Sequence, residues 1–174
     1  MQRASRVTLA LVTILLLCVT VVAGLAAPAG TSALTLSSLE RQVITSVNAQ
    51  RVAHGQAPVR AHSSLMAAAR AQSRDMAHRS FFSHYSLSGA SFGSRLVSYG
   101  YRRDGYSAWS VGENIASARA GTLAATPQGV VILWMQNAAH RRVVLGAAFR
   151  DVGVGVHLAG GRRYFTLDLG YRRP

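Results

Sequence analysis

A row of valines near the C-terminal end of the chain constrains the possible fold more than any other stretch. Every second position there carries a large apolar side chain: Val152, Val154, Val156 and Leu158. The intervening glycines leave room for another group to approach that face of the strand. Gly160 and Gly161 are typical of a tight turn, and residues 163–170 have the composition of a partner strand. The sequence therefore predicts an antiparallel hairpin whose valine row faces the core.

The first part of the chain has helical patterns. Ser37 and Glu40 fit a capping box, and apolar side chains follow it at helical spacing. A second helix is predicted over residues 65–79, with Ser63 or Ser64 as its cap. Two helices therefore precede any strand pattern.

The middle of the chain changes its pattern twice. From Trp109 the sequence is typical of a strand, and Thr126 followed by Pro127 is typical of a helix start. We predict that this helix covers residues 127–140. Helices, a strand, a helix and a hairpin in that order indicate an α+β fold with an antiparallel sheet.

The N-terminal residues have the composition of a secretory signal peptide. Arg3 and Arg6 precede an uncharged apolar run over residues 7–27, and small side chains follow. We therefore predict a signal peptide over residues 1–27, and its cleavage would leave no membrane span. An uncleaved N-terminal anchor is the alternative, because the run is just long enough to cross a bilayer.

The remaining chain is predicted to consist of a linker, residues 28–35, and one domain, residues 36–174. Cys18 is the single cysteine of the 174-residue chain, and it lies within the predicted signal peptide. Packing rather than disulfides must then stabilise the exported domain. We expect a secreted monomer, either extracellular or in the cell envelope.

The chain is strongly basic, with a formal net charge of +13 and no lysine among its 19 basic residues. Such a positive field attracts polyanions. The arginines are scattered, however, and no nucleic-acid-binding motif accompanies them. We therefore expect no specific nucleic-acid partner, and an anionic polymer of the cell envelope is one candidate partner.

Four strings occur in a specific order: VNAQRVAHGQAPVRAHSSLMAAARAQSRDMA, FFSH, GENIA, and WMQNAAHRRVVL followed by FRDVGVGV. Together they make the chain resemble the CAP superfamily, or SCP domain, of cysteine-rich secretory, antigen five and pathogenesis-related proteins. It is most similar to the cysteine-poor bacterial branch. The resemblance implies a CAP-type α-β-α sandwich, in which helices flank a small antiparallel central sheet and a central cleft.

The same resemblance implies which residues line the cleft. By match to the motifs they are His84 of FFSH, Glu113 of GENIA and His140 of NAAHRR. Asn137 stands where many eukaryotic members carry a second glutamate, and we include it among the cleft residues.

Two imidazoles and a carboxylate suit a first-row divalent metal and leave a fourth tetrahedral position open. His84, Glu113 and His140 are therefore candidate ligands of a metal such as zinc. Alternatively, Glu113 is a buried acceptor that holds the two histidines, because burying an unpaired carboxylate is costly. The sequence leaves both interpretations open.

The expected function is a ligand-binding or interaction module for a small apolar or lipid-like ligand or for an envelope polymer. The alternative is a metal-assisted extracellular hydrolase of the peptidase or nuclease type. The sequence contains no nucleophile elbow, phosphate loop or dinucleotide fingerprint, so we assign no catalytic residue.

Overall fold

Residues 34–174 are the part of the chain that the computed structural model describes. The predicted signal peptide and most of the predicted linker lie outside the described residues. The elements are α1 (Ser38–Ala53), β1 (Arg60–Ala61), α2 (Ser63–Arg79), α3 (Phe92–Ser98), β2 (Ala108–Arg119), a 3₁₀ turn η1 (Leu123–Ala125), α4 (Pro127–Gln136), α5 (Ala138–Val144), β3 (Asp151–Ala159) and β4 (Arg162–Arg173). None of the helices in this part is both long and apolar enough to cross a membrane.

β3 and β4 form the predicted hairpin. Two glycines with positive φ, 55° and 70°, make the turn, a conformation that glycine adopts without steric cost. The strands pair antiparallel, with Val154 opposite Leu167. Val152 and Val154 are fully buried, whereas Leu158 near the turn is 54% exposed. The predicted core face is therefore confirmed along the part of β3 that lies away from the turn.

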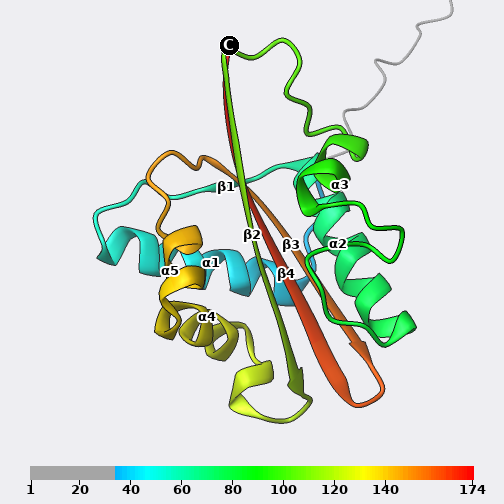
Figure 1. Cartoon of the computed structure of the whole chain (residues 1–174). Helices are drawn as coiled ribbons and strands as arrows, with labels where there is room; N and C mark the ends of the chain where they lie inside the picture. The colour runs from blue at the N-terminus through cyan, green and yellow to red at the C-terminus, as the bar shows by residue number, and fades with distance from the viewer. Residues whose placement is uncertain (1–33) are drawn as a thin grey trace, which may run out of the picture. The chain divides into compact units, whose positions relative to one another are not determined.

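The sheet has the strand order β1-β3-β4-β2. β1 runs parallel to β3, and the other two pairs are antiparallel. Helices cover both faces, with α1, α4 and α5 on one side and α2 and α3 on the other (Figure 1). This arrangement confirms the predicted α+β class, and it places β2 at one edge of the sheet described.

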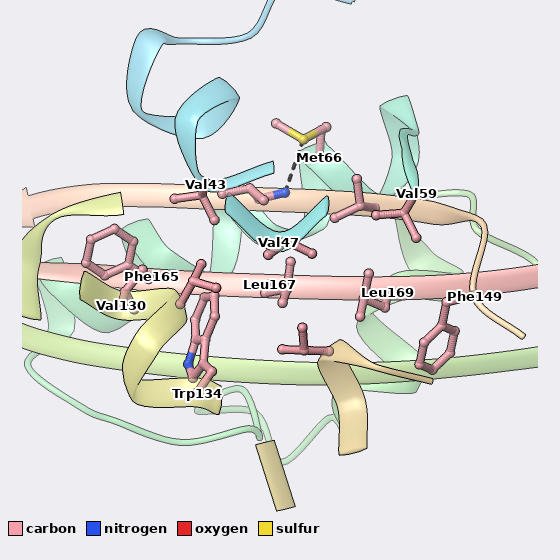
Figure 2. Close-up of a cluster of buried hydrophobic side chains, with 14 residues drawn as sticks. Val43, Val47, Val59, Met66, Val130, Trp134, Phe149, Phe165, Leu167 and Leu169 are labelled. Atoms are coloured by element: carbon pink, nitrogen blue, oxygen red, sulfur yellow. Dashed lines mark hydrogen bonds between the residues drawn. The ribbon is translucent and has the colours of Figure 1, made fainter. Parts of the chain in front are cut away.

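The main core lies between the sheet and the layer of α1 and α4. Figure 2 shows Val47, Trp134 and Leu167 at its centre. All three are at most 1% exposed, and Trp134 donates its indole N–H to the carbonyl of Ile115 on β2. Apolar burial of this extent is the dominant favourable contribution to folding.

The opposite face of β3 packs directly against α2. A Cβ atom at Gly153 would overlap the backbone of Leu65, and one at Gly155 would overlap the backbone of Ala69. The room that these glycines leave is therefore occupied by a helix and not by a ligand.

Two predicted boundaries change in the structure, and one short helix is present that was not predicted. The helix predicted over residues 127–140 breaks at Asn137, whose side chain caps the separate helix α5. His62, and neither of the two serines, caps α2 with its ring nitrogen. Residues before Gly100 form the short helix α3, which is capped by Ser91. The capping box of Ser37 and Glu40 is confirmed.

Candidate functional site

Glu113 is the centre of the candidate site. It lies on β2, and its side chain has no exposed surface. One carboxylate oxygen lies 2.8 Å from Nδ1 of His84, in the loop after α2. The carboxylate accepts, so this ring nitrogen carries the hydrogen. The predicted pairing of His84 with Glu113 therefore occurs, although the two residues are far apart in sequence.

The second oxygen of Glu113 accepts from the guanidinium group of Arg95 on α3. Arg95 is 6% exposed and also donates to the backbone carbonyl of His84 at 3.4 Å. It thus holds both the carboxylate and the loop that carries the histidine. Sequence reasoning did not find Arg95, and its only signal was a lone cation in the short apolar segment SFGSRLVSYG.

Asp168 on β4 is a second carboxyl group at this site that sequence reasoning missed. It is the direct cross-strand partner of Glu113 and is completely buried. Apart from the neighbouring carboxyl group of Glu113, neither of its carboxyl oxygens has a hydrogen-bond partner within residues 34–174. Burial, reinforced by the negative charge of Glu113, raises the pKa of Asp168 well above its usual value, although Arg95 opposes the shift. The group therefore holds a proton to higher pH than an exposed aspartate.

This environment gives the stability a specific pH dependence. The pKa of Asp168 is higher in the folded state than in the unfolded state, where it is about 4. Below that unfolded-state pKa the carboxyl group is protonated in both states, so its ionisation does not lower the free energy of unfolding. The penalty from this ionisation grows as the pH rises from there toward the folded-state pKa. Asp168→Asn removes it while keeping the shape. We expect equal melting temperatures near pH 4 and a higher one for the variant at pH 8, measured by circular dichroism. At each pH the melting temperature of the variant is compared with that of the native chain. If the variant melts below the native chain at pH 8, the ionised carboxylate of Asp168 stabilises the fold and the expectation is wrong.

His140 lies on α5, whereas Glu113 lies on the edge strand β2. Within the described residues its imidazole makes no hydrogen bond, but its backbone carbonyl accepts from the side chain of Asn114 at 3.0 Å. Burial and then the nearby His84 lower the pKa of His140. Side chains alternate along β2, so the neighbours Glu113 and Asn114 point to opposite faces of the sheet. This alternation explains why Asn114, and not Glu113, contacts the residue.

Asn137 has a local structural role. Its side-chain oxygen accepts from the backbone N–H groups of Ala139 and His140, at 2.9 and 3.1 Å. It therefore fixes the start of α5 and so the position of His140. No hydrogen bond between its side chain and Glu113 or His84 occurs in the described structure.

The donor set does not fit a divalent metal in the described conformation. Among residues 34–174, no group of three or more His, Cys, Asp or Glu side chains converges as a metal site requires. Both oxygens of Glu113 are engaged, one of them by a cation. A zinc ion would have to displace Arg95 or share its acceptor. Metal binding by His84, Glu113 and His140 therefore stays a prediction, and we derive no chemistry through it.

A groove runs beside this network along the edge of β2. One hollow of about 470 Å³ is lined by His84, Glu113 and apolar or aromatic side chains that include Tyr85 and Phe92. A second, of about 420 Å³, reaches Phe149. The two share Val111, Gly112 and Val143 in their walls, so they lie next to each other along β2, and together they are called the groove below. Hollows of this size are typical of small-molecule sites.

The absence of a Cβ atom at Gly112 lets Val143 and Phe149 pack closely against β2. An added Cβ would lie 3.1 Å from Val143 and 3.2 Å from Phe149, tighter than ordinary van der Waals contact. Arg51 holds the opposite wall, because it is fully buried and donates to the carbonyls of Val144, Gly146 and Phe149. The floor and one wall of the groove are therefore fixed by the fold.

The fold and motifs agree with one protein family. The model of the cysteine-rich secretory protein family, CAP, matches residues 44–169. The chain belongs to the CAP family. The match covers the elements that carry His84, Glu113 and His140, so the resemblance noted in the sequence is confirmed.

Individual relatives support this membership. The chain is 33% identical over 121 residues to the uncharacterized protein YkwD of Bacillus subtilis, a match that covers 70% of this chain and 43% of YkwD. An extracellular protein containing an SCP domain from Bacillus anthracis is 26% identical, with a TM-score of 0.59 over 78% of this chain and 40% of that one. This CAP chain therefore spans less than half the length of these two relatives.

An outer surface protein of Borrelia burgdorferi shares the fold at 15% identity, with a TM-score of 0.64 over 76% of this chain and 92% of that one. The SCP-domain and outer-surface structures confirm the α+β CAP fold. The Bacillus anthracis relative is an extracellular protein, in agreement with the secreted or cell-envelope location predicted for this chain.

Proposed function

We propose that this CAP-family protein is an extracellular binding module that holds an apolar or lipid-like ligand in the groove along β2. The adjacency of the two hollows carries the proposal. Val111, Gly112 and Val143 line both, so an extended apolar chain that lies along β2 would contact both hollows, from Tyr85 to Phe149. Burying apolar surface there contributes about 25 cal/mol per Å² before the costs of binding are subtracted.

The charges beside the groove suggest how such a ligand is oriented. Arg142 lines the part of the groove that reaches Phe149. Arg142 also lines an adjoining hollow of about 330 Å³, together with Arg141. A carboxylate or phosphate head group at that end would meet two cations, and its acyl chain would extend toward Phe92. The proposed ligand is therefore an amphiphile with an acidic head.

Blocking the groove tests the proposal. Val143→Glu places a carboxylate in the shared wall, and we expect it to weaken binding of a dansyl-labelled C12 fatty acid at least about tenfold, since burying an unpaired charge is costly. Fluorescence titration of the full chain provides the measurement. Val97→Glu is the matched control, because Val97 lies on α3, is 39% exposed and is not in the groove wall. Equal binding by both variants would exclude the groove.

The head group can be tested separately. Arg142→Ala should weaken binding of the fatty acid more than binding of the corresponding labelled alcohol. Arg119→Ala, at an exposed arginine at the end of β2, should leave both unchanged. An equal loss for acid and alcohol in the Arg142 variant would contradict the proposed orientation.

A further inference from the structure

Another hollow, separate from the groove, lies between α2, α3 and the loop that joins them. It has a volume of about 360 Å³. α2 contributes Gln72, Arg74 and Asp75, α3 contributes Ser94 and Ser98, and Tyr99 follows directly after α3. None of its lining residues lines either part of the groove. Arg95 forms part of its wall while its guanidinium group holds Glu113, so a single arginine separates the two sites.

The walls of this hollow are dominated by hydrogen-bonding groups. Four serines and one tyrosine line it, and its apolar lining residues are two alanines. In the described structure Ser98 donates to a backbone carbonyl, whereas no hydrogen bond of the side chains of Ser88 and Tyr99 is present. A hydroxyl group both donates and accepts. The hollow can therefore match a ligand that presents many hydroxyl groups of its own.

The charges around the hollow nearly cancel, although the whole chain is strongly basic. Arg74 and Asp75 are adjacent in sequence and both line the wall, and Asp75 also pairs with Arg79 at 3.1 Å. The charge of Arg95 is used by Glu113. This local balance favours an uncharged ligand over a polyanion.

Tyr99 adds an aromatic surface at the rim. It follows the last residue of α3 and is 42% exposed. An aromatic ring with a polar tip gives a ligand both an apolar face to pack against and a hydrogen-bonding group. Sugar rings combine apolar C–H faces with hydroxyl edges, so they suit this combination.

We propose that the hollow between α2 and α3 binds an uncharged saccharide, with a sugar ring against Tyr99 and its hydroxyl groups on the serines, Gln72 and Asp75. This site is independent of the groove along β2. The domain would then hold a lipid-like ligand at one site and a glycan at the other.

The two exposed tyrosines provide a matched test. Tyr85 lines the groove and is 60% exposed, whereas Tyr99 lines the hollow. We use cellotetraose and chitotetraose as probes and titrate the full chain by isothermal calorimetry and amide NMR shifts. Tyr99→Ala should weaken tetrasaccharide binding at least about tenfold and leave fatty-acid binding unchanged. Tyr85→Ala should do the reverse.

Ser88→Leu provides a second variant in case Tyr99→Ala perturbs α3. Ser88 is exposed in the loop, and a leucine there would fill the hollow without removing a hydrogen bond of the fold. It should also abolish tetrasaccharide binding.

Three results would overturn the proposal. One is the absence of binding for both tetrasaccharides up to about 10 mM, well above the range of a specific site. Another is equal affinity in the native chain and the Tyr99 and Ser88 variants. The third is binding of tetragalacturonate alone, lost on addition of salt, which would indicate general attraction of a polyanion. Failure of the fatty acid to bind would leave this proposal standing.

Discussion

Replacement of Val154 by aspartate should abolish cooperative folding of the domain. Val154 is completely buried in the main core, and its backbone N–H lies 3.1 Å from the sulfur of Met66 on α2. Burying a carboxylate there without a partner costs several kcal/mol, comparable to the whole stability of a small domain. Circular dichroism should show no cooperative thermal transition.

Leu158→Asp is the control on the same strand. Leu158 belongs to the same alternating row, but it is 54% exposed beside the hairpin turn. Its substitution should change the free energy of unfolding by no more than about 0.5 kcal/mol, as is usual at surface positions. A native-like transition in the Val154 variant, or equal damage from both substitutions, would contradict the assigned core face.

Replacement of Arg95 by methionine is expected to have the second large effect. It leaves the buried carboxylate of Glu113 beside the carboxyl group of Asp168 without its cation. Removing one partner of a buried ion pair typically costs about 3–5 kcal/mol. The double change Arg95→Met and Glu113→Gln should cost clearly less than the sum of the single changes, because both break one network. Urea unfolding of the native chain, the two single variants and the double variant gives the four free energies of this double-mutant cycle.

Arg70 is the matched comparison for Arg95. It also pairs with a buried glutamate, Glu40, at 2.6 Å, but its own side chain is 38% exposed and water can replace it. Arg70→Met should therefore be much milder than Arg95→Met. Equal costs for the two substitutions, or strict additivity in the cycle, would show that Arg95 and Glu113 do not depend on one another.

The hairpin could be predicted from sequence because its signals are local. Alternating valines and a glycine pair specify strand, turn and face within about 20 residues. The break at Asn137 could not be predicted in the same way. Residues on both sides of it favour helix, and only the capping hydrogen bonds to Ala139 and His140 show that a second helix starts there.

The candidate site could be predicted only in part. The motifs identified His84 and Glu113, and the structure brings them into contact. Arg95 and Asp168 belong to no motif, and their roles follow from the packing of α3 and from the register of β2 with β4. The sequence shows which side chains of one strand share a face. It does not show the register, that is, which residue of a distant strand lies opposite each of them.

The position of a bound fatty acid tests the central claim most directly. A fatty acid carrying a nitroxide label broadens amide NMR signals near it, and the effect can be mapped in the full chain. If the ligand lies in the groove, the strongest broadening falls on Val111, Gly112 and Val143, which line both parts of the groove. Broadening concentrated on Arg74 and Tyr99 in the other hollow, or none at a saturating concentration, would contradict the assignment of the groove as the ligand site.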